Sequence, residues 1–160
     1  MQLIERRLRN RRAFSLIELV IVVVILGIIG AIAIPRMSRG SAGAAESALV
    51  SDLATLRGAI DLYAAEHNGT YPTLADFSNQ LLTYTDVSGN TNATKTTTFA
   101  YGPYLRSIPP LPVKSARQGQ NGVGNADGAT IGWIYDETAG TIRANTSAGE
   151  GNGTADWSTF

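Results

Sequence analysis

Sixteen consecutive residues near the amino terminus, Leu19 to Ile34, carry no polar side chain. The segment reaches 21 residues when it is counted from Phe14, with only Ser15 and Glu18 as polar interruptions. About 20 helical residues cross a hydrocarbon core of ~30 Å, so residues 14–35 are predicted to form a transmembrane helix. Five arginines against one glutamate give residues 1–13 a net charge of +4. This charge predicts a cytoplasmic amino terminus.

Three kinds of segment fit this pattern: a cleaved secretory signal, a plain signal anchor, and a signal cut on the cytoplasmic side of the apolar stretch. An ordinary secretory signal has an apolar core of about 7 to 15 residues. This stretch is longer and runs through Pro35 into sequence that still has helical character. A carboxylate such as that of Glu18 costs roughly 2.5 to 3.5 kcal/mol inside a membrane helix, and less near its end. A plain anchor has no reason to keep one, so the third kind is favoured.

The residues around this boundary resemble a known signal. The run Arg11-Arg12-Ala13-Phe14-Ser15-Leu16-Ile17-Glu18-Leu19 is similar to the class III signal of bacterial type IV pilins and type II secretion pseudopilins, in which Phe-Thr-Leu-Ile-Glu follows the cleavage point. The resemblance implies that prepilin peptidase cuts between Ala13 and Phe14 and methylates the new amino group of Phe14. Residues 1–13 would then be a leader peptide, with Ala13 where the family usually has glycine.

The same resemblance gives Phe14 and Glu18 a role in subunit assembly, and residues 14–35 a place in a filament core. The Glu18 carboxylate of one subunit would meet the Phe14 amine of its neighbour, and each charge would offset the desolvation of the other. Such a pair would set the axial register of the subunits, as buried polar groups do in coiled coils. Pairing of Glu18 with the amine of its own chain is the alternative.

The helix between Gly27 and Pro35 is predicted to be the easiest part to unwind. Gly27 and Gly30 each weaken it by about 1 kcal/mol relative to alanine, and Pro35 removes a backbone hydrogen bond. In the filaments that this chain resembles, the region melts and the fibre stretches, so the same melting is predicted here. A kinked but intact helix is the alternative for the isolated subunit.

Residues 36–160 are predicted to form one small periplasmic or extracellular globular domain. Apolar residues recur there at spacings of 4, 3, 4 and 3, which predicts a helical stripe that ends near Glu66; they are Leu49, Leu53, Leu56, Ile60 and Tyr63. Asn68 and Gly69 supply a left-handed stop. The following Gly69-Thr70-Tyr71-Pro72 resembles the major pseudopilins and related pilins. A short helix that begins with a capping box of Thr73 and Asp76 is predicted next.

The C-terminal half favours a small antiparallel sheet. Residues 88–98 are predicted to form a polar loop, and the prolines of residues 101–112 exclude a central strand or a helix interior. Strands over 130–135 and 141–145 are predicted to form a β-hairpin, with Trp133 and Tyr135 against the long helix. Residues 146–160 are predicted to be a mobile or neighbour-contacting tail. The predicted fold class is α+β and pilin-like, with a long N-terminal helix packed on a C-terminal antiparallel sheet.

Catalytic chemistry is not indicated, so we expect no enzyme and no cofactor. His67, the single histidine, lies at a predicted helix end, where capping or solvation is expected, and the chain has no cysteine and no hydrolase, zinc-protease or phosphate-loop motif. Asp127 and Asp136 could contribute oxygens to calcium, as in some major pseudopilins, but without an Asp-x-Asp-x-Asp-Gly pattern they are expected to form turns. Residues 14–160 carry a net charge of −4, which argues against nucleic acid.

The resemblance implies a structural subunit of a type II secretion pseudopilus or a type IV pilus-like filament. The subunit would be held in the bacterial inner membrane and later lie in a periplasmic pseudopilus or an extracellular pilus. The implied partners are copies of the chain, other minor pilins or pseudopilins, prepilin peptidase and an inner-membrane assembly platform. The lack of cysteine favours the pseudopilus, whereas Pro110-Leu111-Pro112-Val113 departs from the Asp-Pro-Trp-Gly of many secretion-system members. A monomeric membrane-anchored periplasmic binding module is the alternative.

Overall fold

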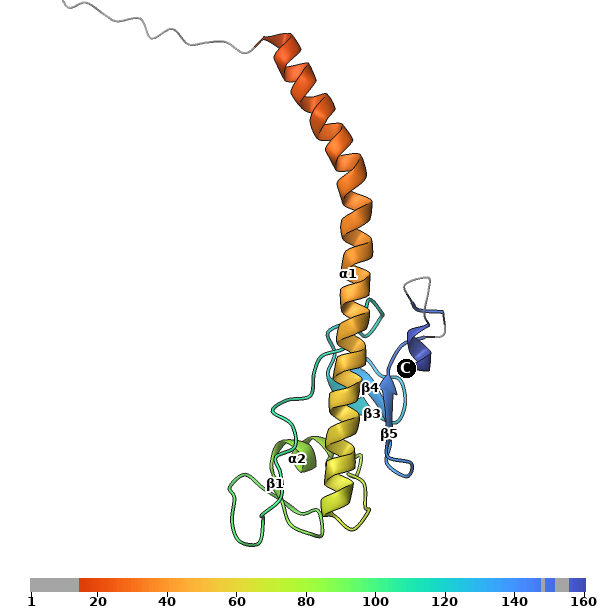
Figure 1. Ribbon diagram of the computed structural model, residues 1–160. Helices are drawn as coiled ribbons and strands as arrows, with labels where there is room; N and C mark the ends of the chain where they lie inside the picture. Colours follow the sequence, from red (N-terminus) through yellow and green to blue (C-terminus); the bar gives the residue numbers. More distant parts are fainter. Residues whose placement is uncertain (1–14, 148, 152–155) are drawn as a thin grey trace, which may run out of the picture. The chain divides into compact units, whose positions relative to one another are not determined.

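The computed structural model describes residues 15–147, 149–151 and 156–160, with the backbone alone for 33–40, and divides the chain into two compact units, 1–39 and 40–160. The secondary structure confirms the predicted α+β class with a long N-terminal helix (Figure 1). The helices are α1 (Leu16–Glu66), α2 (Phe77–Leu82) and the 3-10 helix η1 (Trp157–Thr159). The strands are β1 (Tyr84–Thr85), β2 (Thr91–Asn92), β3 (Gly122–Gly124), β4 (Ile131–Asp136) and β5 (Thr141–Ala144).

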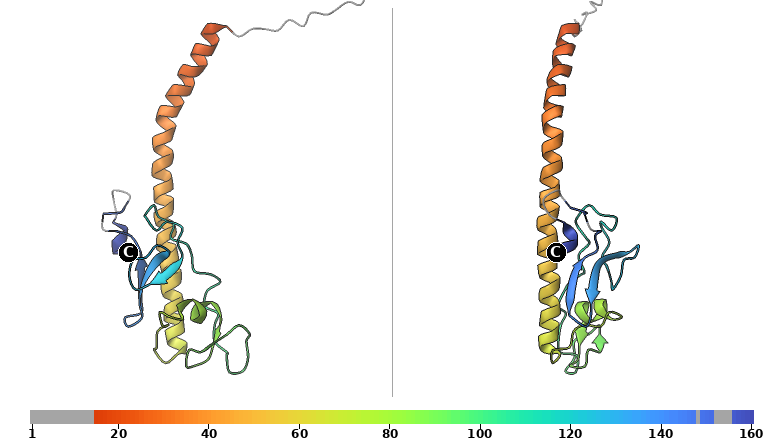
Figure 2. Two further views of the ribbon diagram at one scale, coloured as in Figure 1. Left: turned by 180° about the vertical axis from the view of Figure 1, so that it is seen from behind. Right: turned by 90° about the vertical axis from the view of Figure 1, so that its right-hand side faces the viewer.

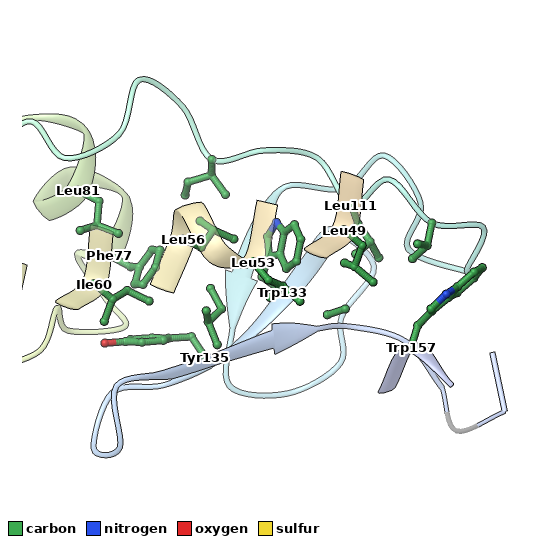
Figure 3. Packing of buried hydrophobic residues seen from close by; sticks show 14 of the residues in the cluster. Leu49, Leu53, Leu56, Ile60, Phe77, Leu81, Leu111, Trp133, Tyr135 and Trp157 are labelled. Carbon is green, nitrogen blue, oxygen red and sulfur yellow. The ribbon is translucent and has the colours of Figure 1, made fainter. Parts of the chain in front are cut away.

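The core of the 40–160 unit lies between the C-terminal part of α1 and the sheet that contains β4 and β5 (Figures 2 and 3). Every member of the predicted apolar stripe, from Leu49 to Tyr63, is at most 2% exposed. Trp133 and Tyr135 of β4 are at most 1% exposed and belong to the same cluster, as predicted. Their polar ends are bonded, because the Trp133 indole donates to Pro109 O (2.8 Å) and the Tyr135 hydroxyl donates to Pro72 O (2.8 Å).

The end of α1 confirms the predicted left-handed stop. Asn68 has a φ of 56° and Gly69 a φ of 80°. The N–H of Gly69 donates to Ala64 O at 2.8 Å, which is the six-to-one hydrogen bond of a Schellman motif. The chain therefore leaves the helix without an orphaned carbonyl at this position.

The predicted capping box is wrong, because α2 begins at Phe77 and the side chain of its N-cap residue Asp76 makes no capping hydrogen bond. In a capping box the Thr73 N–H would donate to the Asp76 side chain, but here the buried side-chain amide of Gln80 is its acceptor. Gln80 Oε1 accepts from the Thr73 N–H at 2.8 Å, while Gln80 Nε2 donates to Gly89 O at 2.9 Å. Residues 74–76 form a turn instead of a helical start.

The sheets correct two expectations. Residues 88–98 are not wholly a loop, because β2 pairs antiparallel with β1 and the turn between them is held by the Asp86 carboxylate, which accepts the N–H groups of Ser88 and Asn90. The larger sheet has the order β3-β4-β5 and is mixed, with β3 parallel to β4 and only β4 and β5 antiparallel. A side chain at Gly132 would overlap the Gln120 carbonyl, so this glycine allows the close approach of the segment before β3.

Residues 156–160 are bound to the core and to α1, which corrects the mobile form of the predicted tail; its neighbour-contacting form stays a prediction. Trp157 of η1 is 3% exposed and joins the hydrophobic cluster. The Asp156 carboxylate caps η1 by accepting from the Ser158 N–H at 2.9 Å. Arg57 of α1 donates to Phe160 O at 3.0 Å and to Ile142 O at 3.2 Å, which joins the helix, β5 and the C-terminal segment.

Candidate functional site

The candidate site is the exposed N-terminal segment, which we define as residues 15–32 of the first unit. Its large aliphatic side chains are exposed on every side of the helix, from 41% at Val20 to 81% at Leu16. They are Leu16, Ile17, Leu19, Val20, Ile21, Val22, Val23, Val24, Ile25, Leu26, Ile28, Ile29 and Ile32. Within the described parts of the chain, no helical stretch combines the length and apolarity needed to cross a membrane.

Glu18 is the one charged residue of the exposed segment and lies in the first turn of α1. The turn is closed by the Leu19 N–H, which donates to Ser15 O at 3.2 Å. A carboxylate at this end of a helix interacts favourably with the helix dipole. The side chain of Glu18 is exposed, so its carboxylate is open to a partner from outside the segment. Ala13 and Phe14, the predicted processing residues, lie outside the described residues.

The residues of the predicted melting segment lie in unbroken helix. The backbone of α1 is helical through Gly27, Gly30 and Pro35. A Cβ at Gly27 or Gly30 would meet no atom within 4 Å, so neither glycine is needed for packing within this chain. Each still lowers helix stability by about 1 kcal/mol relative to alanine. The backbone is helical without a break here. Melting in a filament and a kink in the isolated subunit both stay predictions.

Asp127 and Asp136, considered above for calcium, have different partners. Arg117 donates two hydrogen bonds to the Asp127 carboxylate, from Nε at 2.7 Å and from a terminal nitrogen at 2.8 Å. These bonds, together with one from Asn145, hold the pKa of Asp127 far below its ordinary value. Asp136 accepts from the Thr138 N–H at 2.8 Å, so it forms the expected turn. Among the residues that the structure describes, no three acidic or histidine side chains group as metal ligands. The expectation of no cofactor, with calcium as the alternative, stays a prediction.

Solvation and capping were the two roles expected for His67, and the structure excludes solvation. Its ring is 2% exposed and stacks on Tyr63 with centroids 3.8 Å apart. Its Nδ1–H donates to Tyr63 O at 2.7 Å, so the ring caps a carbonyl in the last turn of α1, which was the other expected state. The nearby Tyr104 hydroxyl donates to Glu66 at 2.6 Å, and burial together with this bond raises the pKa of Tyr104.

Sequence reasoning missed the contacts of Arg57, a residue of α1 that lies outside the apolar stripe. Its guanidinium instead crosses to the outer edge of β5. The periodicity of a helix shows which face a residue occupies, and it carries no information on how far a long side chain reaches. The sequence contains no signal that would have identified the acceptors.

Comparison with known proteins finds one similarity, and it covers the candidate site. Residues 8–34 match the family described as Prokaryotic N-terminal methylation motif. No curated protein and no solved structure matches the chain. The match includes Glu18, Gly27, Gly30 and the predicted cleavage point between Ala13 and Phe14. It indicates a type IV pilin-like precursor of the kind that prepilin peptidase processes, and it favours a structural protein over an enzyme.

Proposed function

We propose that this chain is a structural subunit of a type II secretion pseudopilus or a type IV pilus-like filament, assembled through residues 14–35 after cleavage between Ala13 and Phe14. The observation that carries the proposal is the exposed N-terminal segment with its single carboxylate at Glu18. The methylation motif supports it, because residues 8–34 include both the segment and the cleavage point.

The aliphatic surface of the segment supports a covered state. Full burial of one valine, leucine or isoleucine side chain contributes roughly 1.5–3 kcal/mol, and these side chains are about half exposed in the subunit. Each would therefore gain about 1 kcal/mol if another molecule covered it. Soluble proteins rarely leave so large a contiguous apolar surface in water. We infer that the inner membrane covers it before assembly and that copies of the same segment cover it in the filament.

Glu18 would then pair with the methylated amine of Phe14 from a neighbouring copy. Cleavage creates this positive charge four residues before the carboxylate. Removal of one partner from a buried ion pair costs about 3–5 kcal/mol, because the other charge stays desolvated and unpaired. In a filament with the wrong register, every subunit would contain such an unpaired charge and would be destabilised by this amount. Glu18 therefore acts through register more than through the stability of the subunit.

The test is incorporation of Glu18→Gln into filaments that also contain tagged wild-type subunits. The neutral amide has nearly the same size, so membrane insertion and the fold of residues 40–160 should be unchanged. A cost of about 3–5 kcal/mol corresponds to incorporation reduced by roughly a hundredfold to a few thousandfold. Asp61→Asn is the matched control, because Asp61 is an exposed acid on α1 in the other unit, and it should incorporate normally.

Mass spectrometry of the wild-type chain accompanies this test. The expected mature chain begins at methylated Phe14. Normal incorporation of Glu18→Gln would refute the register role. An uncleaved chain that stays monomeric would refute the filament subunit and would favour a membrane-anchored binding module.

A further inference from the structure

We draw no further inference here: the strongest candidate, the cavity of about 680 Å³ between Arg57 of α1 and the β4–β5 hairpin, carries nothing, because Arg57, Asp136 and Glu137 on its walls are already bonded to main-chain groups of this chain and nothing in the structure shows what covers it.

Discussion

Gly140, in the turn between β4 and β5, should tolerate no side chain. Its φ is +67°. A Cβ added there would lie 2.6 Å from Cδ1 of Tyr71, and two further atoms of the same ring would be closer still. Gly119 provides a matched control, because its φ is +81° but an added Cβ would meet nothing within 4 Å. The two positions therefore share the backbone constraint and differ in the steric one.

The expected magnitudes follow from this difference. An alanine held in the left-handed region costs about 1–2 kcal/mol, which should be the whole effect of Gly119→Ala. Gly140→Ala carries the same cost and adds about 1–3 kcal/mol for overpacking against Tyr71. Tyr71 cannot move away without loss, because its ring packs on the core cluster and the next residue, Pro72, accepts the Tyr135 hydroxyl. Gly140→Ala should therefore destabilise by about 2–5 kcal/mol.

Urea unfolding of the full-length chain in non-ionic detergent measures both variants. The two tryptophans of the chain, Trp133 and Trp157, are buried in the 40–160 unit, so their fluorescence reports its unfolding. In a double-mutant cycle, Tyr71→Ala should remove the excess cost of Gly140→Ala and leave only the backbone cost. Equal destabilisation by Gly119→Ala and Gly140→Ala, or additive effects in the cycle, would refute the steric argument.

Substitutions at three further residues test other contacts. Trp157→Ala should destabilise the 40–160 unit by about 3–5 kcal/mol in urea unfolding followed by circular dichroism, because Trp157 is a core side chain. Arg57→Ala should cost about 1–3 kcal/mol in the same assay through two lost charge-assisted hydrogen bonds, and Arg57→Lys should cost less. The Arg117 ion pair lowers the pKa of Asp127, so its stabilisation is complete above the ordinary carboxyl pKa and is lost as pH falls below about 4. Urea midpoints of Asp127→Asn should accordingly fall less than wild-type midpoints between pH 5 and 3.

Elements with a strong local signal were predictable from the sequence. The buried stripe of α1 follows from apolar spacing alone, because a helix turns every 3.6 residues and one face must pack. Asn68 and Gly69 tolerate a positive φ, so the end of α1 could be predicted from these two residues. The hairpin of β4 and β5 was visible because two short apolar runs with a glycine-containing connection leave few other arrangements.

Elements that depend on distant partners were not predictable. The three residues of β3 include two glycines and resemble a loop, and β3 is a strand only because β4 pairs with it in parallel. The C-terminal segment was predicted to be mobile or neighbour-contacting from its terminal position, yet Trp157 packs in the core and Arg57 binds the main chain of Phe160. In each case the partner is more than five residues away along the chain, where periodicity and turn chemistry give no information.

The two described parts of α1 show why folding alone does not account for this chain. From Leu49 to Tyr63 the helix presents one apolar face, and its own globular unit buries that face. In residues 15–32 the aliphatic side chains are exposed on every face. Gly27 and Gly30 make no packing contact that would offset the helix stability lost relative to alanine. Such a segment contributes little to the stability of its own subunit, since a side chain gains hydrophobic free energy only when it leaves water. The proposed cover by another molecule would account for the sequence of this segment. The proposed pairing of Glu18 would then favour the arrangement of subunits in which no charge is left unpaired.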